Sequence, residues 1–239
     1  MGLDERRAKC RDLIRRYYSA VPRREDLLDR AVVRDLPADA RLLDAGCGED
    51  LPMLERYANR VGVAVGVDRA TPVVDPRGRF IRGDLSALPF ATGSFDLIIS
   101  RSVFEHLEDP VAVFAEMRRV LRPNGKLVFT TPNKYYYSCL VARTIPFRWK
   151  DLYMRWMFGE EGYDHFPVYY RANTRNAFRQ IAKAAKLRLE RTDAVRAYPY
   201  YLMFSPLLFR LGMYYDWTIT ALGLDSLQST WLVVMSKQE

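Results

Sequence analysis

Short apolar runs alternate with polar, helix-like stretches along the first half of the chain. The runs cover residues 41–44, 61–68, 79–85, 94–100 and 126–133, and the most apolar of them are continuous, not alternating. Continuous runs are typical of parallel strands whose two faces are covered by helices. Residues 110–121 place Val113, Phe114, Met117 and Val120 at the spacing of one helical face. The pattern therefore predicts an α/β fold with a mostly parallel sheet and helices on both faces.

Polar residues follow four of these predicted strands, at the point where each strand ends. They are Asp44, Asp68, Asp84 and Ser100. Ligands of open parallel sheets bind beyond the carboxyl ends of the strands, so these four residues predict a binding cleft at one edge.

A glycine turn follows the first of these strands, in the sequence Asp44-Ala45-Gly46-Cys47-Gly48. Glycine lets the backbone approach a ligand closely, and a helix that begins after such a turn offers free N–H groups. We interpret Cys47 as a small residue that fills the turn. Asp68 follows Asp44 by 24 positions, near the spacing at which an acid on the second strand meets ribose hydroxyls. A site for a dinucleotide such as NAD would need a glycine at position 51, three residues after Gly48. Leu51 stands there instead, which argues against a dinucleotide site.

The chain resembles the class I S-adenosylmethionine-dependent methyltransferases, particularly the small-molecule branch that is similar to ubiquinone-biosynthesis enzymes. The matching residues are Leu43 to Gly48, Val67-Asp68, Gly83-Asp84-Leu85, Ser94 to Ile98, His106-Leu107 and Leu121 to Leu127. The resemblance implies a Rossmann-like sheet of seven strands with the last strand antiparallel, and S-adenosylmethionine as the cofactor.

The resemblance also implies a role for each matching residue. Asp44 and the turn of Gly46, Cys47 and Gly48 are expected to face the methionine part of the cofactor, and Asp68 its ribose hydroxyls. Asp84 and Leu85 are expected at the adenine, and Ser100 and Arg101 near the sulfonium. Arg69 is also expected to bind the cofactor. One departure is Asp50, where the family often has a third glycine. Asp50 either caps the following helix or helps to hold the cofactor's ammonium group.

The second half of the chain carries two aromatic-rich insertions, residues 134–172 and 196–228. With an N-terminal helical lid (1–36) and a cofactor-binding core (37–133), they make up a single predicted methyltransferase domain of residues 1–239. Grouped aromatic rings bury large areas and can stack on flat acceptors, so we expect the insertions to wall the acceptor pocket. Arg210, Gly212 and Asp216 interrupt the apolar run of the second insertion, so it is too short to span a bilayer. The insertion could instead lie in a membrane interface or form a homodimer contact.

Both histidines of the chain are candidate general bases. His165 follows Asp164 in the first insertion, and His106 follows the fourth strand. Histidine is the natural base at neutral pH. We predict an O-methyltransferase with His165 as the base, His106 as the second catalytic candidate, and Tyr169, Tyr170 and Arg171 holding a small-molecule, sugar or lipid-linked acceptor. N-methylation of an amine or nucleic acid and a non-catalytic cofactor-binding protein are the alternatives.

Composition bears on the partners and the cellular compartment of the protein more than on its reaction. The 239 residues carry a formal charge of +8, concentrated in N-terminal arginines, which indicates either an anionic partner or a solvated helix face. Nucleic acid is an unlikely partner, because Ser100-Arg101-Ser102-Val103 replaces the Asn/Asp-Pro-Pro-aromatic tetrapeptide of enzymes that modify base amines. Three cysteines without paired spacing indicate a cytoplasmic protein, with peripheral membrane contact left open. We expect no metal, because the acids are dispersed.

Overall fold

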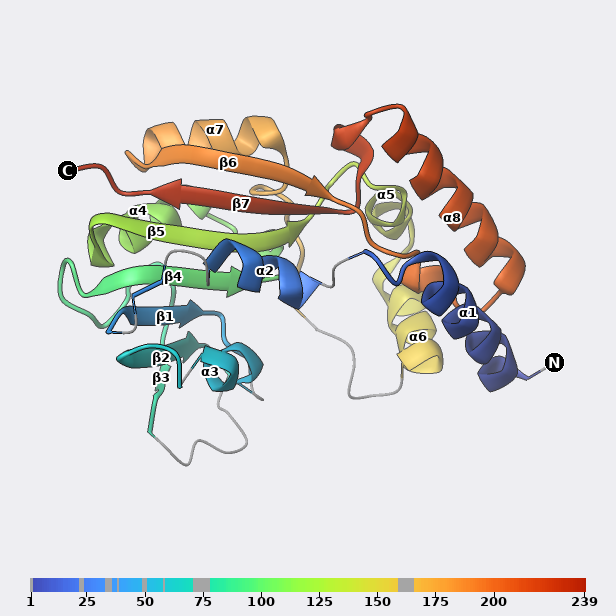
Figure 1. Cartoon of the computed structure of the whole chain (residues 1–239), viewed down its shortest axis with the longest axis horizontal. Coiled ribbons are helices and arrows are strands. Elements are labelled where there is room, and N and C mark those ends of the chain that lie inside the picture. Colours follow the sequence, from blue (N-terminus) through green and yellow to red (C-terminus); the bar gives the residue numbers. More distant parts are fainter. Residues whose placement is uncertain are drawn as a thin grey trace. The chain divides into compact units, whose positions relative to one another are not determined.

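Residues 2–21, 24–32, 36–37, 39–48, 51–57, 59–70, 78–158 and 166–239 are described by the structure, a computed structural model (Figure 1). Contacts between residues divide the chain into two units. Unit 1 comprises residues 1–23, 132–167 and 194–230, and unit 2 comprises residues 24–131, 168–193 and 231–239. The predicted insertions fall mostly in unit 1 and the predicted core in unit 2. The prediction of one domain over the whole chain stays a prediction.

Seven strands form one sheet in the order β3-β2-β1-β4-β5-β7-β6. The strands are β1 (Arg41–Ala45), β2 (Val63–Asp68), β3 (Phe80–Arg82), β4 (Phe95–Arg101), β5 (Leu121–Pro132), β6 (Arg188–Val195) and β7 (Thr230–Ser236). Strands β3, β2, β1, β4 and β5 pair in parallel. The arrow of β7 points against those of β5 and β6 in Figure 1. The predicted fold class and its antiparallel last strand are confirmed.

Helices cover both faces of this sheet, which explains why its central strands are apolar throughout. In Figure 1, α2 (Arg24–Val32) and α3 (Pro52–Tyr57) lie on the near face, and α4 (Pro110–Val120) and α7 (Arg175–Ala184) lie behind it. Leu42, Leu43, Ile98 and Ile99 are fully buried as a result. The chain reverses its winding direction at β1, between β2 and β4, and such a switch point is where open α/β sheets bind ligands.

The helices of unit 2 begin at residues that the sequence supplies for that purpose. The side chain of Asp109 accepts a hydrogen bond from Ala112 N at 3.1 Å, and Pro110 occupies the first turn of α4. Thr174 caps α7 in the same way through Ala177 N, also at 3.1 Å. Both helices therefore start where side-chain oxygens satisfy their free N–H groups.

An aromatic cluster positions the segment that follows β4. Phe104 lies in the short helix η2 (Phe104–His106), and its ring centre lies 4.7 Å from that of Phe129 and 4.9 Å from that of Phe114. Phe129 in turn contacts Phe178 of α7 at 5.7 Å. Such ring pairs add stabilisation beyond their buried area. The cluster fixes η2 beside the carboxyl ends of β4 and β5.

The turn that leads into the body of β5 differs in detail from what the sequence suggests. Gly125 in Arg122-Pro123-Asn124-Gly125 is the residue expected at a positive φ, but Asn124 carries it, at 62°. Asparagine tolerates this conformation because its short side chain hydrogen-bonds locally. Gly125 is needed for space instead, since a Cβ there would lie 2.9 Å from the carbonyl oxygen of Arg122.

Unit 1 is helical. It contains α1 (Leu3–Tyr17), α5 (Tyr137–Thr144), α6 (Phe147–Phe158) and α8 (Pro206–Ala221), with the short helices η4 (Tyr200–Leu202) and η5 (Asp225–Leu227). Figure 1 shows α1 running alongside α8, and the two helices contact each other. Their shared core consists of Cys10, Met157, Met203 and Phe209.

A buried carboxylate ties three segments of unit 1 together. Asp216 of α8 is 1% exposed, and it accepts hydrogen bonds from the hydroxyls of Tyr18 at 3.3 Å and Tyr136 at 3.1 Å. The guanidinium of Arg196 lies 4.6 Å from the ring centre of Tyr18. Burial raises the pKa of Asp216 to about 7.

Candidate cofactor site and the loops beside it

The glycine turn after β1 adopts a backbone that requires glycine. Gly46 has φ 79° and Gly48 has φ 70°, both in the left-handed region. A Cβ on Gly46 would lie 2.3 Å from Cγ2 of Val103, whereas a Cβ on Gly48 would meet no atom of the described residues within 4 Å. Gly46 therefore serves close packing, and Gly48 leaves open space where a ligand can approach the backbone.

Neighbouring strands hold the turn on both sides. The backbone N–H groups of Gly46 and Cys47 donate to the carbonyl oxygen of Val67 at 2.8 and 3.3 Å. The hydroxyl of Ser100 donates to the carbonyl oxygen of Ala45 at 2.7 Å. Cys47 is buried, and a Cβ on Gly66 would meet its sulfur at 2.7 Å. The turn is thus rigidly held, with Cys47 packed as a filler.

Asp44 is a buried carboxylate with unused hydrogen-bonding capacity. It is 2% exposed, and its Oδ2 has no hydrogen-bond partner among the residues that the structure describes. Burial raises its pKa to about 7, against the opposing effect of the nearby Arg101. An unpaired buried oxygen is costly, so this atom is suited to a ligand that brings a hydrogen-bond donor or a positive charge.

Asp68 is held in place by backbone donors. Its Oδ2 accepts from Gly48 N and its Oδ1 from Ala70 N, both at 2.9 Å. Each carboxylate oxygen has a second lone pair, so Asp68 can still accept hydrogen bonds from a ligand. Its neighbour Arg69 turns away to pair with Asp84 at 2.5 Å.

Both carboxylate oxygens of Asp84 already have partners in the protein, Ser86 of the same turn and Arg69. Its Oδ1 accepts from the backbone N–H and the hydroxyl of Ser86, at 2.8 and 2.7 Å. These bonds and the Arg69 pair lower the pKa of Asp84 to about 2. The next residue, Leu85, is buried. Assignment of Asp84 and Leu85 to the adenine stays a prediction.

The structure brings most of the predicted cofactor residues to one edge of unit 2. Asp44 lies near the end of β1, Gly46 and Gly48 follow that strand, Asp68 ends β2, and Arg101 ends β4. The Ser100 hydroxyl is used in the bond to β1, so that side chain supports the turn. Asp50 lies outside the described residues. An unpaired buried carboxylate oxygen, an open glycine turn and a fixed acid fit an adenosyl cofactor that carries an ammonium group and ribose hydroxyls.

A polar network beyond β4 and β5 was not anticipated from the sequence. The buried Glu105 of η2 accepts a hydrogen bond from the hydroxyl of Thr131 at 3.3 Å, and Thr131 accepts from the side-chain amide of Asn173 at 2.7 Å. All three side chains are nearly fully buried. The only sequence signal was that Glu105 precedes His106 and that Thr131 ends a strand.

The predicted acceptor residues lie against the same segment. The backbone N–H groups of Tyr169 and Tyr170 donate to the carbonyl oxygen of Glu105 at 2.8 and 3.1 Å. Arg171 places its guanidinium 5.4 Å from the ring centre of Tyr169. Two residues here have unusual positive φ values, Ser102 at 55° and Tyr170 at 52°. Backbone strain of this kind is concentrated at functional sites.

The two candidate bases have different outcomes. His106 is partly exposed in η2, one residue after Glu105, and so lies beside the 169–171 segment. His165 falls outside the described residues, so its role stays a prediction. Of the two, His106 is the one that the described structure brings next to the predicted acceptor residues.

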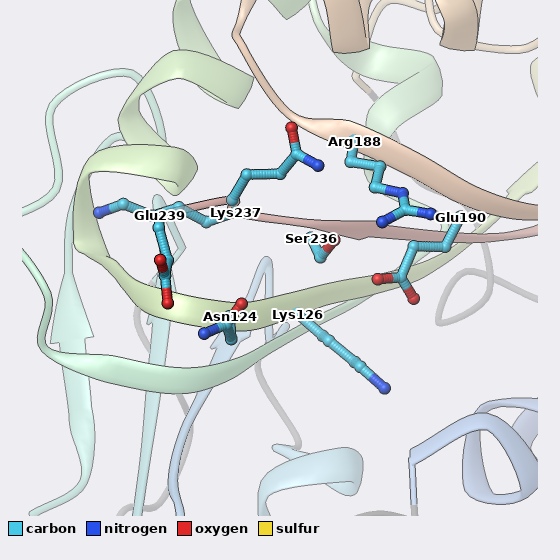
Figure 2. Close-up of a pocket in the computed structure, with 8 residues that line it drawn as sticks. Asn124, Lys126, Arg188, Glu190, Ser236, Lys237 and Glu239 are labelled. Atoms are coloured by element: carbon cyan, nitrogen blue, oxygen red, sulfur yellow. The ribbon is translucent and has the colours of Figure 1, made fainter.

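A separate hollow of about 560 Å³ lies at the other end of the strands (Figure 2). Figure 2 shows Lys126 of β5, Arg188 and Glu190 of β6, and Lys237 after β7 around it. Because Lys126 lies near the start of the parallel part of β5, this hollow is remote from the strand ends that carry Asp44 and Asp68. It is not part of the cofactor edge.

Within the ranges given above, no group of three or more His, Cys, Asp or Glu side chains is placed to hold a metal ion. No helix in the described part of the chain has the length and apolar character needed to cross a membrane.

A glycine turn, acids at neighbouring strand ends and a sheet that reverses at β1 define an α/β domain that binds a nucleotide-like cofactor. Sequence comparison narrows this class. The family described as "Methyltransferase domain" matches residues 43–129. Over this core the chain is similar to the class I S-adenosylmethionine-dependent methyltransferases, whose cofactor is S-adenosylmethionine.

Named relatives agree on this class. A probable S-adenosylmethionine-dependent methyltransferase of Mycolicibacterium smegmatis is 36% identical over 104 residues, which are 41% of this chain and 40% of that protein. The malonyl-acyl-carrier-protein O-methyltransferase of Legionella pneumophila is 33% identical over 104 residues, 39% of this chain and 37% of the relative. The chain thus covers about two fifths of the length of these curated relatives. The ubiquinone-biosynthesis-like branch stays a prediction.

Solved structures show the same fold. The YcgJ protein of Bacillus subtilis superposes with a TM-score of 0.58 at 16% identity, over 90% of this chain and 98% of its own. The geranyl diphosphate C-methyltransferase of Streptomyces coelicolor also gives 0.58, at 15% identity over 89% and 76% of the two chains. The [4+2]-cyclase SpnF gives 0.56, at 17% identity over 90% and 79%. At such identities the likeness concerns the fold alone.

Proposed function

We propose that this protein transfers a methyl group from S-adenosylmethionine to a hydroxyl group of a small-molecule, sugar or lipid-linked acceptor. The observation that carries the cofactor half of this proposal is the unpaired Oδ2 of the buried Asp44, next to the open turn at Gly48. The acceptor half is supported by η2, where Glu105, the residue before His106, accepts hydrogen bonds at its carbonyl oxygen from the backbone N–H groups of Tyr169 and Tyr170.

The residues of unit 2 have distinct roles in this proposal. Asp44 accepts from the ammonium group of the cofactor, and the backbone of Gly46 to Gly48 allows the methionine part to approach. Asp68, already fixed by Gly48 and Ala70, accepts from the ribose hydroxyls. Arg101 lies at the end of β4 on the same edge. When bound, the cofactor supplies an electrophilic methyl group on a sulfonium.

The protein's main contribution is to align the acceptor and exclude water. Correct alignment of two reactants can lower a barrier by about 7–11 kcal/mol. A hydroxyl acceptor must also lose its proton during attack, and a positioned base contributes typically about 10²–10⁴-fold. We assign this base to His106, with His165 as the second candidate, and the acceptor contacts to Tyr169, Tyr170 and Arg171.

The O-methyltransferase of Legionella pneumophila and the C-methyltransferase of Streptomyces coelicolor differ in the kind of atom that they methylate. Their acceptors are therefore not assigned to this chain. Methylation of an amine and cofactor binding without catalysis are the alternatives. An acceptor with a nucleophilic carbon would also need a base, whereas an amine that is already neutral would not.

The test is a panel of hydroxyl, amine and sugar acceptors screened for uptake of labelled methyl from S-adenosylmethionine. We expect a hydroxyl acceptor to be labelled and His106→Ala to lower kcat by about 10²-fold or more, with unchanged affinity for S-adenosylhomocysteine. His165→Ala, measured in parallel, distinguishes the two bases. Labelling of amines alone would overturn O-methylation, and failure to bind S-adenosylhomocysteine would overturn the cofactor site.

A further inference from the structure

Helix α8 of unit 1 exposes an apolar face. Five large side chains along it and at its C-terminal cap are between 57% and 68% exposed: Leu207, Leu211, Tyr214 and Trp217 of the helix, and Leu222 directly after it. At 100° per residue, the first three and Leu222 fall on one face, with Trp217 at its margin. Exposed apolar patches of this kind mark sites of protein or membrane contact.

The opposite face of α8 is already occupied within unit 1. Phe209, Gly212, Asp216 and Ile219 are buried there. A Cβ on Gly212 would lie 2.7 Å from Pro199, so the helix lies closely against the segment that precedes η4. A helix that is apolar on both sides is normally buried on both. The orientation of α8 is thus fixed by one face, which leaves the other turned outward.

Helix α6 repeats this arrangement on a smaller scale. Trp149, Leu152 and Trp156 are spaced by three and four residues, share one face and are 52% to 58% exposed. Arg148 and Arg155 lie together on one flank of that face, and the guanidinium of Arg148 is 5.7 Å from the Trp149 ring centre. Tryptophans flanked by arginines are typical of helices that lie at a membrane surface.

Basic residues lie on and beside α8, on α8 itself and on α1. Arg210 is the only charged residue of α8 that is exposed, since Asp216 is buried. The adjacent α1 exposes five basic side chains against three acidic ones; the basic residues are Arg6, Lys9, Arg11, Arg15 and Arg16. Anionic lipids attract such basic segments at short range.

We propose that the exposed face of α8, together with the Trp149–Trp156 face of α6, docks onto the surface of an anionic lipid membrane. A helix of 16 residues is about 24 Å long and lies in the plane of the interface, with Tyr214 and Trp217 at the depth of the headgroups. A second copy of this chain is the less suitable occupant. A symmetric contact would place the patch of one copy against the same patch of the other, so that Arg210 and the basic residues of α1 would face equal positive charges. The inference does not depend on the proposed methyl transfer.

Vesicle binding tests the proposal directly. The full chain is sedimented with vesicles of phosphatidylcholine alone and of phosphatidylcholine mixed with phosphatidylglycerol. We expect binding to the mixed vesicles that weakens with salt, and a roughly tenfold or greater loss for the double variant Leu211→Glu/Trp217→Glu, because two apolar contacts are removed. Val111→Glu is the matched control, since Val111 is an exposed apolar residue of α4 in unit 2. It should bind as the unaltered protein does.

Two further measurements separate the possible outcomes. Arg148→Gln and Arg210→Gln should each weaken binding to the mixed vesicles by about fivefold. In a Trp149→Phe/Trp156→Phe protein, the emission of Trp217 should shift to shorter wavelength on vesicle addition, because Trp231 is already buried. Circular dichroism confirms that the variants fold. Vesicle binding that is absent, or equal for the α8 variant and the control, overturns the proposal; a dimer in light scattering that the α8 variant dissociates would assign the face to a second copy.

Discussion

The backbone N–H of Gly48 donates a hydrogen bond to Oδ2 of Asp68 at 2.9 Å, which links the glycine turn after β1 to the end of β2. The acid of the second strand is therefore oriented by the same turn that follows the first strand. A fixed carboxylate loses less conformational freedom when a ligand binds, which favours affinity.

Asp68→Ala should weaken binding of S-adenosylhomocysteine by about 10- to 100-fold, because hydrogen bonds to a charged group are worth about 1.5–3 kcal/mol. Asp68→Asn should lose less, since its amide oxygen still accepts from Gly48 N. Isothermal titration calorimetry measures both affinities. Asp39→Asn, at an exposed position before β1, is the control and should leave the affinity unchanged.

Gly46→Ala and Gly48→Ala should differ in stability even without ligand. Both residues have positive φ, so each substitution carries backbone strain of about 1–2 kcal/mol. Only at Gly46 does the new Cβ also meet Val103, at 2.3 Å. In urea unfolding, Gly46→Ala should therefore be the less stable, and adding Val103→Ala should recover part of the loss. Equal unfolding midpoints for the two alanine variants would contradict the packing role of Gly46.

Protonation of Asp44 should be coupled to cofactor binding. Burial raises its pKa from 3.8 to about 7, so the folded protein retains a proton that the unfolded chain releases between these values. The contribution of Asp44 to the free energy of unfolding consequently falls as the pH rises from about 4 to about 7. An ammonium group beside Asp44 favours its carboxylate form, and binding should release a proton near pH 6.5. The apparent binding enthalpy should then vary with the ionisation enthalpy of the buffer, and Asp44→Asn should abolish this variation.

The hydroxyls of Tyr18 and Tyr136 both donate hydrogen bonds to Asp216, and loss of either should destabilise unit 1. Tyr136→Phe removes the shorter hydrogen bond, 3.1 Å against 3.3 Å for Tyr18, and should cost about 1–3 kcal/mol because a buried acceptor loses its partner. Tyr18→Phe should cost less. Tyr214→Phe, at an exposed position of α8, should change stability little. Urea unfolding monitored by circular dichroism gives the three values; a Tyr136→Phe protein as stable as Tyr214→Phe would show that the Asp216 cluster contributes nothing.

The sequence alone determined the sheet and the cofactor edge, because both depend on local patterns. Continuous apolar runs indicated β1, β2 and β4, and the polar residues at their carboxyl ends, Asp44, Asp68 and Ser100, stand in the same chain segments. The glycine turn needs only neighbouring residues to be recognised. Even there the local detail was incomplete. The left-handed residue near the start of β5 is Asn124 and not Gly125, because crowding by the Arg122 carbonyl oxygen, and not a positive φ, requires the glycine.

Only the tertiary structure decided which distant residues meet. Glu105, Thr131 and Asn173 form one network, and Tyr18, Tyr136 and Asp216 another, although each set comes from segments far apart in the chain. The outward face of α8 belongs to the same category, because α8 is apolar on all sides and its periodicity does not reveal which side is buried. Hydrophobic periodicity reports the local path of the backbone, whereas the pairing of buried polar groups and the choice of a buried face depend on how the elements pack.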